Sequence, residues 1–129
     1  MDITSNDFQA NLSRAEAMIN RALQQRKKPN VLVLPEMWTS GTKTHNGLSV
    51  LDILRDIAAR HSVNIVAGSM IEKRGAQDVF NTAYIIDSQG SIIASYDQVH
   101  CQRHKKLATG SNAVTFDIDS ICCGIILGL

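Results

Sequence analysis

Apolar side chains recur with helical spacing in two segments of the 129-residue chain. One face of the first segment carries Leu12, Ala15, Met18, Ile19, Ala22 and Leu23. This spacing predicts a helix over about residues 6–27 that is closed by Pro29. The second segment predicts a helix that ends near His61, and its Ser49 and Asp52 have the spacing of a capping box. Two amphipathic helices are therefore expected.

The remaining apolar segments are short and predict strands. They are residues 31–35, 63–69, 80–87, 91–97, 113–119 and 121–129. Polar loops are expected over 39–46 and 100–110, and a hairpin-like loop over 72–78. The runs 31–35 and 63–69 do not alternate, which is typical of strands covered on both faces in a layered fold. The order of elements predicts a mixed α/β layer with both helices on one face of the sheet.

Composition excludes several classes of partner. The formal net charge is +1, so no strong field for nucleic acid or an anionic membrane is expected. No run approaches the roughly 20 apolar residues that span a bilayer. The first residues, MDITSNDFQ, lack the basic and apolar regions of a signal peptide. We therefore expect a cytoplasmic protein whose three cysteines are reduced.

Both ends of the chain are unusual for a natural domain. Residues 121–129 are apolar and carry no charge, and no strand precedes the first helix. Natural domains seldom end inside a hydrophobic strand, because the exposed edge and face invite aggregation. We therefore expect a fragment, with low solubility or with association through an exposed apolar edge.

Glu36 follows the apolar strand 31–35 directly and lies two residues before the only tryptophan, Trp38. A carboxylate at this place is either the solvated end of a strand or an acid at the floor of a pocket. Trp38 is interpreted as a packing residue. The adjacent Cys122 and Cys123 are interpreted as small core residues. A zinc site formed by residues 100–104 with these two cysteines is a weaker alternative, because no paired C-x-x-C motif is present.

Several ordered motifs resemble the carbon–nitrogen hydrolase (nitrilase) superfamily, in particular its bacterial omega-amidase-like branch. They are MDITSNDFQANLSRAEAMI, VLVLPEMWTSG, VNIVAGSMIEK, VFNTAYIIDSQGSIIASYDQVH and LATGSNAVTFDID. The resemblance implies an α/β fold, a partial α-β-β-α sandwich that comprises the N-terminal half without its first strand. Residues 1–129 would form one incomplete carbon–nitrogen hydrolase domain. Members of this family usually assemble as dimers or larger oligomers, so a homo-oligomer is implied.

The chemistry that this resemblance implies uses a thiol nucleophile, a glutamate base and a lysine that stabilises the oxyanion, without metal or organic cofactor. Glu36 occupies the position of the base. The family's Tyr-x-Lys-x-His reads Tyr96 to His100 here, so Gln98 stands at the lysine position. Gly128 stands where the cysteine belongs. A neutral amide stabilises an oxyanion far less than an ammonium does.

Three hypotheses follow from the sequence. The first is a hydrolase of small amides by ancestry that is catalytically inactive, a pseudoenzyme retaining only Glu36. The second is a non-catalytic partner that associates with full-length relatives through its outer helices and apolar edge. The third is a thiol or zinc-binding module. Small amides would be substrates of the intact relatives.

Overall fold

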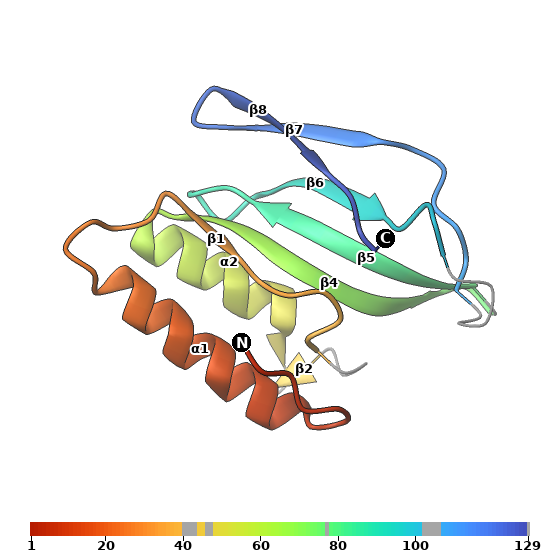
Figure 1. Ribbon diagram of the computed structural model, residues 1–129, viewed down its shortest axis with the longest axis horizontal. Helices are drawn as coiled ribbons and strands as arrows, with labels where there is room; N and C mark the ends of the chain where they lie inside the picture. The colour runs from red at the N-terminus through yellow and green to blue at the C-terminus, as the bar shows by residue number, and fades with distance from the viewer. Residues whose placement is uncertain (40–43, 46–47, 77, 102–106, 129) are drawn as a thin grey trace.

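The computed structural model describes residues 1–39, 44–45, 48–76, 78–101 and 107–128. Helices α1 (Phe8–Leu23) and α2 (Val50–His61) cover one face of a four-stranded sheet, and a hairpin covers part of the other face (Figure 1). The sheet has the order β1-β4-β5-β6, formed by β1 (Val31–Val33), β4 (Asn64–Arg74), β5 (Asp78–Ile86) and β6 (Ile92–Asp97). The hairpin is β7 (Val114–Ile118) with β8 (Ile121–Ile125), and a short pair joins β2 (Thr44–His45) to β3 (Leu48–Ser49).

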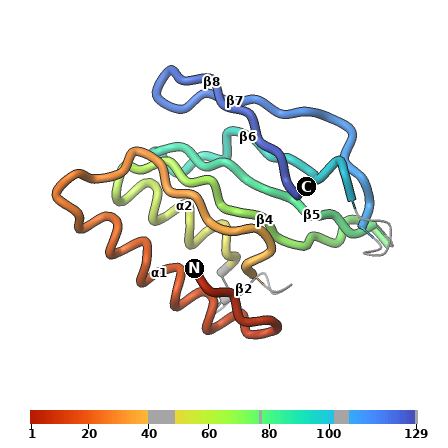
Figure 2. The backbone as a smooth tube through the Cα atoms, in the orientation of Figure 1, coloured from red at the N-terminus to blue at the C-terminus, as the bar shows by residue number. Residues whose placement is uncertain are grey.

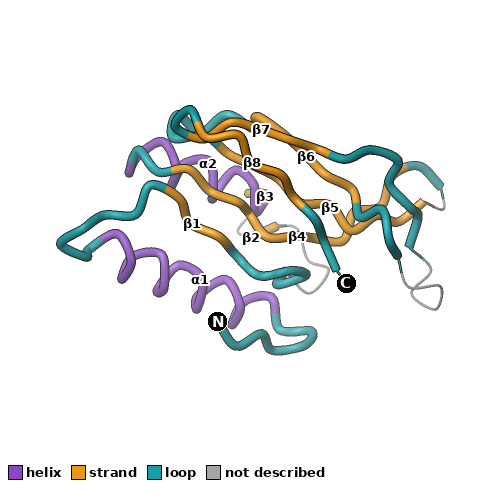
Figure 3. The backbone as a smooth tube through the Cα atoms, turned by 45° about the horizontal axis from the view of Figure 1, so that its top comes forward, coloured by secondary structure: helices purple, strands orange, loops and turns teal. Residues whose placement is uncertain are grey.

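The sheet is mixed, as predicted. β1 runs parallel to β4, whereas β4, β5 and β6 are antiparallel neighbours. Both helices lie on one face of this sheet, which confirms the predicted partial α/β sandwich (Figure 3). The described residues include no helix that is long and apolar enough to cross a bilayer.

The second helix begins as predicted and the first is shorter than predicted. Ser49 caps α2, and its Oγ accepts the Asp52 N–H at 3.0 Å. Asp7 caps α1. That helix ends at Leu23 instead of near residue 27, because residues 24–28 are all polar and offer no apolar side chain to pack.

The main core lies between the helices and the sheet. It contains Phe8, Leu12, Ala15, Ile19, Trp38, Val50, Leu54, Ile57, Ala58, Val63, Ile65, Ala67, Met70 and Ile86. The apolar face of each helix therefore packs as the periodicity predicted, except that Met18 of α1 is 51% exposed. A smaller cluster on the opposite face joins Ala83 and Tyr96 to Leu127, which follows β8. Figure 2 shows the chain ending on this hairpin side, away from α1.

The prediction that strand 31–35 is covered on both faces is wrong. Leu32 and Leu34 pack against the main core, but Val33 on the other face is 72% exposed. β1 is an edge strand of the sheet, so it has a neighbour on one side only. The continuous apolar run shows that both faces of β1 carry apolar side chains. Within the described part of the chain, only the face toward the helices is fully covered.

Residues 72–78, predicted as a hairpin-like loop, lie in the hairpin between β4 and β5, and its paired strands extend further into this stretch than predicted. The pairs Glu72–Phe80, Lys73–Val79 and Arg74–Asp78 extend the ladder through most of that polar stretch. The three successive charged residues at the end of β4 lie toward solvent: Glu72 is half-buried, and Lys73 and Arg74 are exposed. The polarity of the segment therefore marks an exposed hairpin end.

Arg74 is the centre of an ionic network that connects the three antiparallel strands of the sheet. Its Nη1 and Nη2 lie 2.7 and 2.9 Å from the two carboxylate oxygens of Asp97, and Nη2 also lies 3.0 Å from Glu72 Oε2. Tyr84 donates its hydroxyl proton to Glu72 Oε1 at 2.8 Å. The guanidinium lies over the ring of Phe80 at 4.8 Å. The network spans β4, β5 and β6 and stabilises their register.

Three members of this network, Arg74, Tyr84 and Asp97, have shifted pKa values. The hydrogen bond to Asp97 raises the pKa of Arg74. Burial, followed by the hydrogen bond to Glu72, raises the pKa of Tyr84 to about 12. Burial alone would raise the pKa of Asp97, but hydrogen bonds from Arg74 and Thr82 outweigh it and lower that pKa below 3.8. The ionised carboxylate of Asp97 is therefore favoured in the folded state.

The lowered pKa of Asp97 predicts a stability difference that depends on pH. A carboxyl with a depressed folded pKa stabilises the fold above its unfolded pKa, and this contribution is lost as pH falls through the folded pKa. Asp97→Asn is expected to lower the free energy of unfolding by about 1 kcal/mol at pH 7. Urea denaturation should show this difference shrinking below pH 3.8.

Asp56→Asn is the matched control for this experiment. Asp56 pairs with Arg60 on the surface of α2, where both side chains are 61% exposed. Exposed pairs of this kind contribute a few tenths of a kcal/mol, so this variant should differ little from the parent. A loss at Asp97 that is equal at pH 7 and pH 3 would contradict the role given to its charge.

Candidate active site

Glu36 lies in the turn that directly follows β1, at one end of the sheet. Two neighbours of Glu36 attach this turn to β4. The Met37 N–H donates to Ser69 Oγ at 3.0 Å, and the Trp38 indole N–H donates to the Ala67 carbonyl at 2.9 Å. Trp38 is fully buried, which confirms its interpretation as a packing residue. The backbone that carries Glu36 is therefore held by the adjacent strand.

Gly68 makes this attachment possible. It has a φ of +66° and lies where the β4–β5 register shifts between Val66 and Ser69. A Cβ at this position would lie 2.0 Å from the Pro35 carbonyl oxygen and 2.9 Å from Trp38 Cδ1. Only glycine therefore allows the turn to approach β4 so closely.

Asn81 connects Glu36 to Gln98. The Asn81 Nδ2 donates to Glu36 Oε1 at 2.8 Å and to Gln98 Oε1 at 3.0 Å. Asn81 lies on β5, and Gln98 follows the last residue of β6. The Gln98 Nε2 donates to the His100 carbonyl at 3.1 Å. Three segments that are far apart in the sequence thus meet through one buried amide.

Gly128 lies directly against Gln98. A Cβ on Gly128 would lie 2.3 Å from Gln98 Nε2, and the glycine has a φ of +66°. The preceding residue, Leu127, is anchored in the cluster with Ala83 and Tyr96. Glu36, Asn81, Gln98 and Gly128 therefore form one continuous line of contacts.

Cys101 lies beside Gln98, whereas Cys122 and Cys123 lie on β8, away from this line of contacts. Cys101 Sγ donates to the carbonyls of Gln98 and Ala108 at 3.4 and 3.5 Å. Cys122 is exposed and Cys123 is half-buried, so the prediction that both are core residues is wrong. They lie on β8 in a hairpin that covers only part of the sheet. The hydrophobicity of the segment does not bury it, because the described chain places no further layer over β8.

The zinc alternative finds no support in the described part of the chain. That part contains no group of three His, Cys, Asp or Glu side chains arranged to hold a metal ion. Cys101 bonds to loop carbonyls, whereas Cys123 faces an apolar groove beside β1. His104, which the alternative also invoked, lies outside the described residues.

The structure brings together the three positions that the resemblance singled out, Glu36, Gln98 and Gly128. It adds Asn81, which the sequence analysis did not single out. Asn81 is a polar residue within the predicted strand 80–87, and it is completely buried. A fully buried amide within a strand needs hydrogen-bond partners. An asparagine within a predicted strand was therefore the feature of the sequence that could have pointed to this residue.

Comparison with known proteins identifies relatives of this chain. A family model described as Carbon-nitrogen hydrolase matches residues 1–116. The chain is 35% identical over 132 residues to a 2-oxoglutaramate amidase of Bacillus subtilis, which covers 93% of this chain and 49% of that protein. It is 26% identical over 110 residues to the omega-amidase NIT3 of Saccharomyces cerevisiae, which covers 75% of this chain and 38% of that protein.

Solved structures share the fold. The crystal structure of Saccharomyces cerevisiae Nit3, a member of branch 10 of the nitrilase superfamily, matches with a TM-score of 0.84 at 24% identity. That match covers 98% of this chain and 52% of Nit3. An amidase from Nesterenkonia sp. matches with a TM-score of 0.75 at 21% identity, over 96% of this chain and 51% of the amidase. The chain thus spans about half the length of these two solved proteins. It also spans 49% of the Bacillus subtilis amidase and 38% of the omega-amidase NIT3.

Proposed function

The chain belongs to the carbon–nitrogen hydrolase family, and from this premise we propose that it is a member that does not hydrolyse small amides by itself. Glu36 stands at the position of the base, but Gln98 and Gly128 stand at the positions of the lysine and the cysteine nucleophile. The observation that carries the proposal is the direct contact between Gln98 and Gly128. It supports the assignment of these two positions to one site.

The side chains present support inactivity for two reasons. The family's reaction needs a thiolate that attacks the amide carbon and a cation that stabilises the resulting oxyanion. Position 128 carries no side chain, and the Gln98 amide is neutral and already bonded to Asn81 and the His100 carbonyl. Cys101 bonds to two loop carbonyls. The carboxylate of Glu36 thus has no thiol partner among the described contacts.

Purified protein is expected to release no ammonia from 2-oxoglutaramate or other small ω-amides above the buffer rate. The physical reason is that position 128 offers no thiol nucleophile and position 98 offers no cation to stabilise the oxyanion. Glu36→Ala and Cys101→Ser are the matched variants, and neither should change the background. Turnover that disappears in Glu36→Ala would contradict the proposal. Turnover that disappears in Cys101→Ser would show that a displaced thiol serves as nucleophile.

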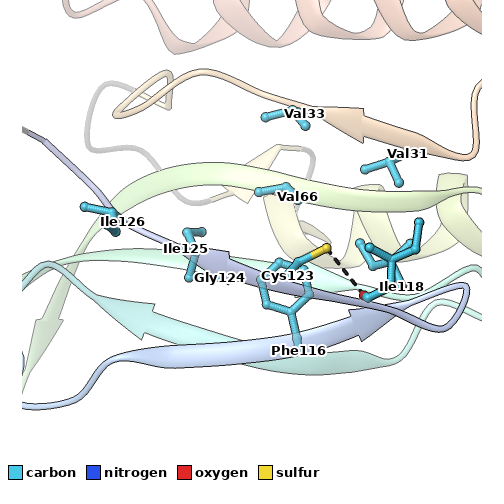
Figure 4. Close-up of a pocket in the computed structure, with 10 residues that line it drawn as sticks. Val31, Val33, Val66, Phe116, Ile118, Cys123, Gly124, Ile125 and Ile126 are labelled. Atoms are coloured by element: carbon cyan, nitrogen blue, oxygen red, sulfur yellow. Dashed lines mark hydrogen bonds between the residues drawn. The ribbon is translucent and has the colours of Figure 1, made fainter.

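An apolar groove favours a second candidate function, association with a second copy or with a longer relative. The groove has a volume of about 400 Å³ and lies between β1 and the β7–β8 hairpin (Figure 4). Its lining includes Val31, Val33, Val66, Phe116, Ile118 and Ile125. Ile121 and Ile126 border it and are 66% and 77% exposed. Exposed apolar surface of this kind is typical of a protein interface.

Val33→Glu is expected to shift the protein toward the monomer, because it places a charge in the apolar groove. Analytical ultracentrifugation of the parent chain should show self-association that this variant weakens. Ile93→Glu is the matched control, since Ile93 is a 41% exposed residue of β6 that does not line the groove. A parent chain that is monomeric and fails to bind a full-length relative would refute the association.

A further inference from the structure

Asn81 is fixed in place by its own strand. Its backbone pairs with Ile71 of β4, and its carbonyl accepts the Gln98 N–H at 3.0 Å. The residue is 0% exposed, so its side chain has no access to bulk water. The position of this amide is therefore set by the centre of the sheet and not by the surface turn that carries Glu36.

The two hydrogens of the Asn81 amide are shared between two acceptors. One Nδ2 contact reaches Glu36 Oε1 and the other reaches Gln98 Oε1. The Asn81 Oδ1 has no hydrogen-bond partner among the described residues. An amide group has two donors and one acceptor atom, and its orientation follows from the partners of each. The orientation of this amide thus depends on Glu36 and Gln98 together.

Glu36 needs such an anchor. It lies in a turn, its side chain is exposed, and the only described hydrogen bond to its carboxylate comes from Asn81. An exposed glutamate otherwise samples several rotamers. The contacts of Met37 and Trp38 hold the backbone of the turn, but they do not orient the carboxylate.

We infer that Asn81 is the positioning residue of this site, which orients the Glu36 carboxylate and couples it to the side chain at position 98. The inference rests on the proposed assignment of Glu36 as the base position. A buried amide that donates to both groups links the exposed carboxylate of Glu36 to the side chain at position 98. Loss of either acceptor leaves a buried donor unsatisfied, so a change at one group is transmitted to the other.

The side-chain amide signals of Asn81 and Gln98 in a nitrogen–proton NMR spectrum test this coupling. Glu36→Ala should shift the signals of both residues. Glu36→Gln retains an acceptor oxygen and should restore the Gln98 signals toward their original positions. Asn64 is the internal control, because it is a buried amide bonded to the Asn30 carbonyl and to the Ser88 N–H, outside the site. Its signals should not move.

Repeating the Glu36→Ala comparison in an Asn81→Ala background tests whether the coupling between Glu36 and Gln98 passes through Asn81. There, Glu36→Ala should shift the Gln98 signals no more than those of Asn64. A Gln98 shift that persists without Asn81 would overturn the inference, as would Asn81 signals that ignore Glu36→Ala. If Asn81→Ala does not fold, the contrast between Glu36→Ala and Glu36→Gln still decides. Because amide turnover is not measured, failure here is distinguishable from failure of the proposed function.

Discussion

Replacing Gly68 with alanine is expected to lower the free energy of unfolding by about 3 kcal/mol or more. The added Cβ would lie 2.0 Å from the Pro35 carbonyl oxygen and 2.9 Å from the Leu34 carbonyl oxygen. Both atoms belong to the backbone and cannot swing away, so β4 or the turn that carries Glu36 must move. Urea denaturation followed by far-ultraviolet circular dichroism measures the loss.

Gly75→Ala is the matched control for this substitution. Gly75 has nearly the same backbone conformation, with a φ of +67° against +66° at Gly68, but no atom lies within 4 Å of its added Cβ. The left-handed conformation alone costs about 1 kcal/mol for a residue with a Cβ. The difference between the two variants therefore measures the close approach of the turn to β4. Equal losses would show that the approach contributes nothing.

Replacing Trp38 with alanine is expected to lower the free energy of unfolding by about 3 to 5 kcal/mol. The indole is 0% exposed and packs in the main core, and its N–H donates to the Ala67 carbonyl at 2.9 Å. Its removal leaves a cavity and also frees the turn that carries Glu36. Circular dichroism is the appropriate probe, since Trp38 is the only tryptophan in the chain.

Trp38→Phe separates packing from hydrogen bonding in this result. Phenylalanine keeps most of the apolar volume but cannot donate to the Ala67 carbonyl, which should cost about 1 to 2 kcal/mol. The Asn81 and Gln98 amide signals should stay near their original positions in this variant, because the turn remains anchored. A loss as large as that of Trp38→Ala would show that the hydrogen bond, and not the packing, holds the turn.

The two anchors have separate roles in the site. Gly68 and Trp38 hold the backbone of the turn against β4, and Asn81 orients the carboxylate that the turn presents. Under the proposed assignment, with glutamine at the lysine position and glycine at the cysteine position, this support around Glu36 is the positioning part of the family's chemistry. Its reactive part would need a thiol at a position where a Cβ already conflicts with Gln98.

Local patterns in the sequence predicted the elements whose contacts are also local. The spacing of apolar residues gave both helices, and the Ser49–Asp52 pair gave the start of α2. The motifs around Glu36 and Gln98 identified the family, because they are ordered along the chain and do not depend on the fold being known. The predictions from the sequence were wrong about where some elements end and about which of their residues are buried. β1 and β8 are apolar, yet Val33 and Ile121 are exposed, since burial depends on which other segments cover a strand.

The sequence by itself thus determined the family, the helices and the main strands, and its resemblance to the family singled out Glu36, Gln98 and Gly128 as candidate site positions. Only the tertiary structure decided that Glu36, Gln98 and Gly128 meet, and that Asn81 joins the first two. The physical reason is separation along the chain: Glu36 and Asn81 are 45 residues apart. No helical or strand period relates residues at that distance. The tertiary structure also decided that position 68 must be glycine, because the Pro35 carbonyl in the segment after β1 leaves no room for a Cβ there.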